Sequence, residues 1–229
     1  MIDSHGHLAD VRIALIVDEL IVELQRLGVT KVIMGGVDPQ EWMRQRDLQH
    51  KYSTFVETSF GIHPWVIAES DDTELESMFE TLSRELATAN FAGEIGLDFF
   101  RCKSSDERLR QEYWCERQLD LAYKLHKPIV VHSVRAHDRM ISLLKKHHIH
   151  SGIIHGFHGN ESIGRQYLNL GFKLSVDGQD FAGRNRGQFS WMKLGDFVLE
   201  SDEPLERSPL PDPKTLARLW VGHLKFPNL

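Results

Sequence analysis

The chain has 229 residues, of which 41% are apolar and 26% charged, so it has the composition of a globular protein rather than a disordered or fibrous one. Its 27 basic and 33 acidic residues give a net charge of −6, so any contact with nucleic acid must come from a local site. Two cysteines, Cys102 and Cys115, offer neither a disulfide framework nor a zinc-ligand spacing. No apolar run is long enough to span a membrane, and no targeting signal precedes the first strand. We therefore expect one cytoplasmic domain over residues 1–229, monomeric and without a membrane partner.

Short apolar runs alternate with longer amphipathic segments along the whole chain, which is the pattern of repeated βα units. We expect strands at Ile2–His5, Lys31–Val37, Thr54–Gly61, Phe91–Gly96, Ile129–His132, Gly152–His155, Phe172–Val176 and Asp196–Glu200. The segments between them predict helices at Ala14–Leu27, Pro39–Lys51, Asp72–Ala89, Glu107–His126, Ala136–His147, Ser162–Leu170 and Lys214–Gly222. The sequence therefore predicts the α/β class and a (β/α)₈ TIM barrel, for which about 200 residues is the usual lower limit.

Two parts of this barrel are expected to be reduced. Gly183 to Gly187 leave room for little more than a loop and a turn of helix, so the seventh helix should be weak. Four prolines between Pro204 and Pro213 predict an extended loop after the last strand. The sequence stops at Pro227-Asn228-Leu229, so the last helix is also expected to be short.

Polar side chains that can bind metal stand at the ends of five of the predicted strands. In a parallel barrel the carboxyl ends of the strands form one face, and catalytic groups project from it. The side chains at i and i+2 of a strand point to the same side, so His5 and His7 can both face the barrel mouth. The full set is His5, His7, Glu94, His132, His155 and Asp202.

Each of these residues alone is weak support, because a single histidine at a strand end is usually a hydrogen-bonded structural residue. Together, four imidazoles and two carboxylates are costly to bury unpaired and form a ligand set for two divalent ions. We expect zinc, manganese or magnesium. Two such ions need a bridging anion, and Glu94 is the candidate because no lysine ends the fourth strand. His5, His7 and Asp202 would hold one ion and His132 and His155 the other, with Asp202 placed to deprotonate the attacking water.

At this point the sequence resembles the TatD family of metal-dependent deoxyribonucleases, within the amidohydrolase-like barrels. The matching stretches are Ile2 to Leu8, Gly61 to Pro64, Gly93 to Asp98, Gln111-Glu112 with Gln118-Leu119, Pro128 to His132, His155 to Phe157 with Gly159, and Glu200 to Pro204. The resemblance implies a (β/α)₈ barrel, a two-metal site from the six residues above, catalytic roles for Glu94 and Asp202, and hydrolysis of DNA from its 3′ end.

The resemblance also implies two substrate contacts. His63 matches a family histidine that contacts the substrate phosphate. Where the family usually has an arginine two residues after the fifth-strand histidine, this chain has Val134, and Arg135 next to it is the candidate phosphate contact. Aromatic and cationic residues in the same loops fit single-stranded DNA or DNA ends: Trp65, Phe99, Phe100, Arg101, Lys103, Arg135, Arg184 and Arg186.

Three functions remain open from the sequence. The first is a deoxyribonuclease in which two metals activate a water. In the second, the same site hydrolyses a small ester, amide or phosphoester, since a barrel alone does not select a substrate. The third is a non-catalytic barrel that keeps its metal ligands but has lost a working substrate site through Val134 and the short tail.

Overall fold

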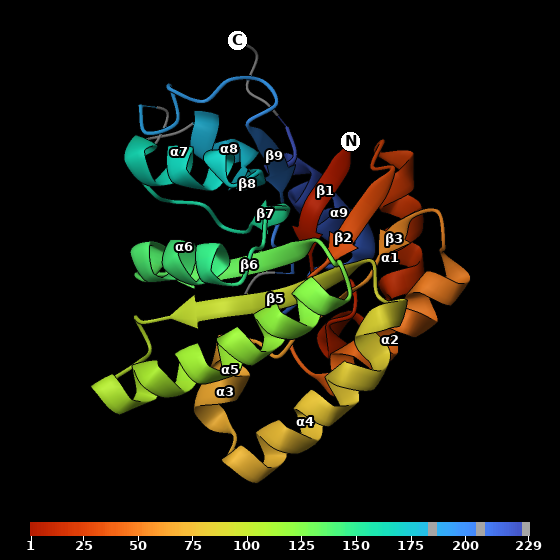
Figure 1. The fold of residues 1–229 in the computed structure, drawn as a ribbon. Coiled ribbons are helices and arrows are strands. Elements are labelled where there is room, and N and C mark those ends of the chain that lie inside the picture. The colour runs from red at the N-terminus through yellow and green to blue at the C-terminus, as the bar shows by residue number, and fades with distance from the viewer. Residues whose placement is uncertain (183–186, 205–208, 226–229) are drawn as a thin grey trace.

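The computed structural model describes residues 1–182, 187–204 and 209–225. Parallel strands form the centre of the molecule and helices surround them, which is the expected TIM-barrel architecture (Figure 1). The strands are β1 (Ile2–Gly6), β2 (Lys31–Met34), β3 (Val56–Glu57), β4 (Ser59–Phe60), β5 (Phe91–Asp98), β6 (Ile129–Val134), β7 (Gly152–Ile154), β8 (Phe172–Asp177) and β9 (Phe197–Glu200). The helices are α1 (Val17–Arg26), α2 (Pro39–Lys51), α3 (Pro64–Glu69), α4 (Asp72–Glu85), α5 (Ser105–Lys124), α6 (His137–Lys146), α7 (Glu161–Asn169), α8 (Gly178–Ala182) and α9 (Pro213–His223). Short 3₁₀ helices lie at Val11–Ile13 and Leu86–Thr88.

The barrel wall consists of two parallel sheets, β1-β2-β3 and β4 to β9 in chain order. At one seam β3 and β4 are two halves of the expected third strand, divided at Thr58, whose N–H donates to Asn90 Oδ1 at 3.0 Å. At the other seam β9 lies beside β1, where Ser4 Oγ donates to the Leu199 carbonyl at 2.8 Å. The chain termini of the barrel therefore meet, with β1 next to β9 and α9 in Figure 1.

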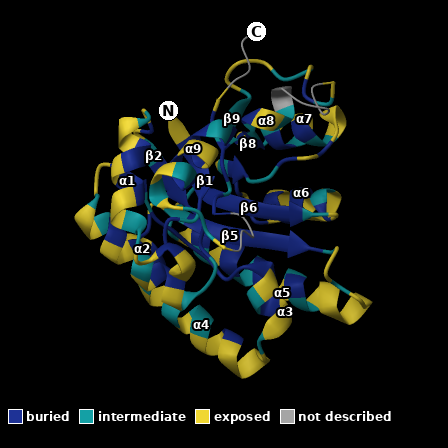
Figure 2. Ribbon diagram, turned by 180° about the vertical axis from the view of Figure 1, so that it is seen from behind, coloured by how far each residue is buried: buried dark blue, intermediate teal, exposed yellow. Residues whose placement is uncertain are grey.

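Aliphatic side chains from several strands fill the interior of the barrel. Ile33 of β2, Val130 of β6 and Ile153 of β7 pack in one buried cluster, with Phe91 and Val198 against it. Strands on opposite sides of the wall supply this layer, as barrel cores require. Figure 2 shows the central strands β5 and β6 largely buried and the outer faces of the helices exposed. These side chains fill the interior of the barrel. The carboxyl ends of the strands therefore form its open face.

Most helices start where the sequence places a capping residue. Asp71 accepts from the Glu74 N–H while the Glu74 side chain accepts from the Asp71 N–H, which is a capping box at the start of α4. Asp212 caps α9 at Pro213, which stands in the first turn, where proline is favoured. Within the described ranges, no helix is both long and apolar enough to cross a bilayer.

The helices differ from expectation in two places and agree with it in a third. The first was expected from Ala14 but begins at Val17, after a 3₁₀ turn. The short α3 was not expected, and it begins at Pro64 with His63 as its N-cap. The weak seventh helix is confirmed, since α8 has five residues before the chain enters 183–186, outside the described residues.

Candidate metal centre

The six side chains predicted from the strand ends meet at the carboxyl end of the barrel. These six residues and His63 form three groups of three. Within each group the possible ligand atoms lie within 4.8 Å of one another. These groups are His5, His155 and Asp202; His5, His7 and Glu94; and His63, Glu94 and His132. The barrel therefore assembles a single polar cluster from strands that are far apart in the sequence.

Glu94 lies at the centre of this cluster, and its two carboxylate oxygens face different imidazoles. Oε1 lies 3.4 Å from His5 Nε2 and 3.8 Å from His7 Nε2. Oε2 lies 3.6 Å from His132 Nδ1 and 3.8 Å from His155 Nε2. A carboxylate with histidines on both oxygens has the placement that a bridge between two ions requires.

Asp202 closes the cluster on the side that solvent reaches. Its Oδ1 lies 3.3 Å from His7 Nε2 and 3.6 Å from His5 Nε2. The Asp202 side chain is 38% exposed and that of His7 is 20% exposed, whereas His5 and Glu94 are buried. The residue has a φ of 54°, in the left-handed region that non-glycine residues rarely adopt, and its N–H donates to the His5 carbonyl at 2.9 Å. This hydrogen bond fixes the loop after β9 to the end of β1.

Buried polar atoms without hydrogen-bond partners test whether these residues fit a metal. Among the described residues, His5 Nε2 and Glu94 Oε1 are buried, face each other at 3.4 Å and have no hydrogen-bond partner; a few buried polar atoms outside the cluster, such as Ser59 Oγ, also have none. Native proteins rarely leave such atoms unsatisfied, and each needs an explanation such as an ion. The gaps of 3.4–3.8 Å between imidazole nitrogens and carboxylate oxygens exceed hydrogen-bond lengths and leave room for ligand bonds to a shared cation. The residues therefore fit divalent metal ions.

Asp3 and Gly35 hold the cluster in place from beneath. The buried Asp3 carboxylate accepts from the Ser201 hydroxyl at 2.6 Å and from the Trp220 indole N–H at 2.5 Å, which ties β1 to the loop of Asp202 and to α9. Gly35 follows β2, and a Cβ there would lie 2.4 Å from His7 Cε1 and 2.8 Å from Glu94 Oε1. Only glycine leaves these two ligands their space.

Comparison with known proteins agrees with this geometry. Residues 2–218 match the family model described as TatD related DNase. The chain belongs to the TatD family. A TatD homologue of Escherichia coli K12, named uncharacterized metal-dependent hydrolase YjjV, is 31% identical over 181 residues, covering 77% of this chain and 69% of that protein. Its crystal structure superposes with a TM-score of 0.78, at 28% identity, over 97% of this chain and 88% of the other. The Yersinia pseudotuberculosis protein named 3′-5′ ssDNA/RNA exonuclease TatD is 29% identical, over 93% of this chain and 84% of that one.

Membership in the TatD family makes the chain a metal-dependent hydrolase that acts on ester bonds and confirms the (β/α)₈ barrel. It also gives the cluster of imidazoles and carboxylates a chemical context. The number and identity of the ions, and the role of each side chain, are taken up below as proposals.

Two carboxylates that the sequence analysis did not single out lie next to the histidines of the cluster, on the side away from Glu94. Glu200 Oε2 lies 3.1 Å from His155 Nδ1, and its Oε1 accepts the Gly156 N–H at 2.8 Å. Glu41 Oε1 lies 3.6 Å from His7 Nδ1. A carboxylate on the outer nitrogen orients an imidazole and makes it a better metal ligand. Glu200 could have been found from the sequence, because it ends a strand two residues before Asp202. Glu41 lies in a helix, and nothing in its sequence context indicates a role at the site.

His63 joins the cluster with a defined tautomer. Its Nδ1 accepts the Trp65 backbone N–H at 3.0 Å, and its Nε2 lies 3.5 Å from Glu94 Oε2. Burial, with the nearby imidazole of His132 adding to it, lowers the pKa of His63 to about 4, so the ring is neutral. A neutral imidazole that accepts at Nδ1 carries its hydrogen at Nε2. His63 therefore presents an N–H donor to the centre of the site.

The imidazoles keep both cluster carboxylates ionised. Burial by itself would raise the pKa of Glu94, but the contacts with His5 and His132 outweigh it and hold this pKa well below its ordinary value. Burial likewise opposes ionisation of Asp202, and His155 and His7 outweigh it and lower the pKa of this carboxyl. Both groups are thus available as anionic ligands or proton acceptors at neutral pH.

Arg135 does not join the cluster. Its exposed guanidinium lies over the Phe100 ring at 4.5 Å, and its φ is 54°. Arg101 lies over the Trp65 ring at 4.0 Å in the neighbouring loop. Arg184 and Arg186 lie outside the described residues.

Proposed function

We propose that this TatD-family chain is a nuclease that hydrolyses phosphodiester bonds of DNA, removing nucleotides from the 3′ end of a single strand. The observation that carries the proposal is the central carboxylate of Glu94, whose oxygens face separate sets of imidazoles at 3.4–3.8 Å. This arrangement suits two ions held side by side, which is a common device for phosphodiester hydrolysis. The name of the Yersinia relative, a 3′-5′ ssDNA/RNA exonuclease, supports the choice of substrate.

In this proposal, six side chains hold two divalent ions of zinc, manganese or magnesium. Glu94 would bind both ions, His5, His7 and Asp202 would bind one, and His132 and His155 would bind the other. When bound, such ions neutralise phosphate oxygens and make a water acidic enough to ionise near neutral pH. His155 also lies within reach of the first set, stacked on His5 at 3.8 Å between ring centres.

Asp202 receives the proton of the attacking water in this proposal. Its carboxylate is ionised, lies at the solvent-facing side of the cluster, and is 38% exposed. A proton accepted at Oδ1 can therefore pass to solvent without crossing the barrel core. A general base must combine this access with hydrogen-bond reach of the water.

His63 donates to the phosphate in this proposal. Its Nε2–H points into the cluster beside Glu94 and His132, at 3.5 and 3.3 Å. A fixed donor of this kind stabilises the charge that develops on a phosphoryl oxygen, and it costs no reorganisation because Trp65 already holds the ring.

The loops around the cluster supply contacts for a strand of nucleic acid. Arg101 on Trp65 and Arg135 on Phe100 form two arginine–aromatic pairs. Aromatic faces stack on bases of any sequence and arginines contact the phosphates, which is how single strands are bound without sequence readout. Arg135 thus remains a proposed substrate contact, at the edge of the site rather than beside the metals. Both cysteines are free, which fits our proposal of a cytoplasmic location.

An end-labelled single-stranded oligonucleotide tests the function. Incubation with magnesium, manganese or zinc should give a ladder of shortened products with the wild-type protein and none with Glu94→Ala. A label at the 5′ end should show progressive loss from the 3′ end. Intact oligonucleotide in every metal, together with rapid hydrolysis of a small ester or lactone, would assign the site to a small-molecule hydrolase. Metal binding without turnover of either substrate would favour a non-catalytic barrel.

A further inference from the structure

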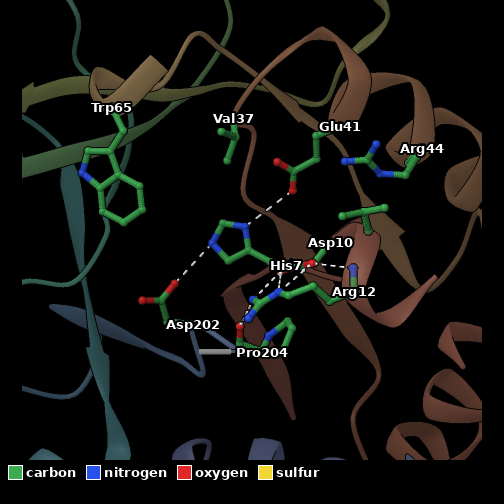
Figure 3. Close-up of a pocket in the computed structure, with 10 residues that line it drawn as sticks. His7, Asp10, Arg12, Val37, Glu41, Arg44, Trp65, Asp202 and Pro204 are labelled. Atoms are coloured by element: carbon green, nitrogen blue, oxygen red, sulfur yellow. Dashed lines mark hydrogen bonds and ion pairs between the residues drawn. The ribbon is translucent and has the colours of Figure 1, made fainter. Parts of the chain in front are cut away.

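A pocket of about 310 Å³ opens beside the metal cluster, on the side where His7 and Asp202 are exposed (Figure 3). This volume is near the lower end of the range for small-ligand sites, so the pocket suits one small unit rather than a chain. The side chains of Asp10, Arg12, Val37, Glu41, Arg44 and Trp65 also line it. The pocket therefore adjoins the position where the proposed function places the reacting phosphate.

The indole ring of Trp65 forms one wall of this pocket and is fixed from three directions. Its Nε1 donates to Asp98 Oδ2 at 2.7 Å, and its ring meets His63 edge-on at 4.7 Å between centres. Arg101 lies 4.0 Å from the ring centre but does not line the pocket. Arg101 thus packs on the ring without itself lining the pocket, and the Trp65 side chain forms part of the pocket wall. Trp65 is 36% exposed, so part of its side chain is accessible to a ligand.

The charged groups elsewhere in the pocket have partners within the protein. Arg12 pairs with Asp10 at 2.5 Å, Arg44 Nε donates to the Ala9 carbonyl at 2.7 Å, and Glu41 faces His7. These contacts hold the charged side chains in fixed positions at the rim of the pocket. A flat, uncharged aromatic group with hydrogen-bonding edges fits a pocket whose walls include Trp65 and Val37 and whose rim is polar.

We propose that this pocket receives the terminal nucleotide of the strand, with its base stacked on Trp65. The proposal rests on the nuclease function above and adds the residue that recognises the leaving unit. Stacking on an indole is tolerant of sequence because every base has a π face, and Arg101 behind the ring anchors it. A pocket that holds one nucleotide beside the metal cluster also agrees with the proposed removal of nucleotides one at a time.

The test compares two single-stranded oligonucleotides that differ only in whether the terminal nucleotide carries its base or is abasic. Removing a stacked base typically weakens binding by about tenfold or more. The wild-type protein should therefore cleave the abasic substrate with kcat/KM about tenfold lower. In Trp65→Ala, kcat/KM on the natural substrate should fall about tenfold relative to the wild type, whereas kcat/KM on the abasic substrate should hardly change. Trp65→Phe should keep most of the wild-type preference for the natural substrate.

Tyr113→Ala provides a matched control. Tyr113 is another exposed aromatic residue beside an arginine, with Arg117 at 5.6 Å, but it lies on α5 outside the pocket. This variant should discriminate as the wild type does. A readout without turnover comes from chelated protein, in which a nucleoside monophosphate should quench tryptophan fluorescence in the wild type and much less in Trp65→Phe.

The outcomes separate the two proposals. Equal cleavage of both oligonucleotides by the wild type, or equal losses on both in Trp65→Ala, would leave the nuclease intact and overturn stacking on Trp65. Failure of the wild type to cleave either oligonucleotide with any metal would overturn both proposals.

Discussion

His155 Nδ1 lies 3.1 Å from Glu200 Oε2, so the outer nitrogen of this imidazole is held by a carboxylate while Nε2 points at Glu94. Glu200 is itself fixed, because its other oxygen accepts the Gly156 N–H at 2.8 Å. The last residue of β9 thereby sets the orientation of a ligand that follows β7. His7 has a similar partner in Glu41 at 3.6 Å.

Glu200→Gln should weaken metal binding without unfolding the barrel. The amide keeps the shape but loses the charge that orients His155, and such changes typically cost about 10- to 100-fold in metal affinity or activity. Isothermal titration with zinc or manganese measures the loss. Asp120→Asn is the control, because Asp120 lies 2.7 Å from His147 Nδ1 in a histidine–carboxylate pair outside the cluster. Equal affinity in Glu200→Gln and wild type would remove Glu200 from the metal centre.

Gly35→Ala should abolish metal binding or reduce it severely, because the added methyl would lie 2.4 Å from His7 and 2.8 Å from His5 and Glu94. Crowding of this kind typically costs about 1–3 kcal/mol and displaces side chains. Gly187→Ala is the matched control, since nothing lies within 4 Å of a Cβ there. Metal content and melting temperature should change for the first variant only. Full metal occupancy in Gly35→Ala would show that the cluster tolerates more movement than its packing implies.

His63→Leu, which has no hydrogen-bond donor, should lower kcat/KM about 100-fold or more while the protein keeps its full metal content. This expectation follows from the Nε2–H donor, because removal of one fixed donor to developing charge typically has that effect. Metal analysis and steady-state kinetics on the same preparation distinguish the roles. A variant that lost one ion would make His63 a ligand instead of a phosphate contact.

The sequence predicted the barrel and the six-residue cluster because both depend on local patterns. Short apolar runs mark buried parallel strands, and a polar residue at the end of such a run, as at His132, must lie on the open face. Glu41 and Gly35 could not be found in this way. Their importance comes from how α2 and the β2 loop pack against His7, and packing between distant elements leaves no periodic signal. The division of the third strand at Thr58 has a similar origin, in the side chain of Asn90.

His223 should stabilise the fold at neutral pH and lose this effect in alkali. Burial opposes its charged form, but Asp177 at 2.8 Å and Glu203 at 3.2 Å outweigh burial and raise the pKa of His223 to about 9. A raised pKa in the folded state means that the stabilisation is complete below the ordinary pKa of about 6.5 and disappears as pH rises through about 9.

Thermal unfolding at pH 7 and pH 10 checks this prediction. His223→Gln should melt below the wild type at pH 7, and the two melting temperatures should converge at pH 10. The comparison with the variant cancels the effect of other groups that titrate in alkali. A gap between the two proteins that stayed constant over this range would show that His223 acts through packing alone.

The number of divalent ions per chain, measured by elemental mass spectrometry after equilibration with zinc or manganese, tests the central claim most directly. The account predicts two ions in the wild type, two in the control Glu112→Gln, whose carboxylate pairs with Arg139 at the surface, and at most one in Glu94→Gln. Glu94 carries this prediction because its two oxygens face the two sets of histidines. A wild-type protein that binds no ion, or a Glu94→Gln variant that keeps both, would contradict the account.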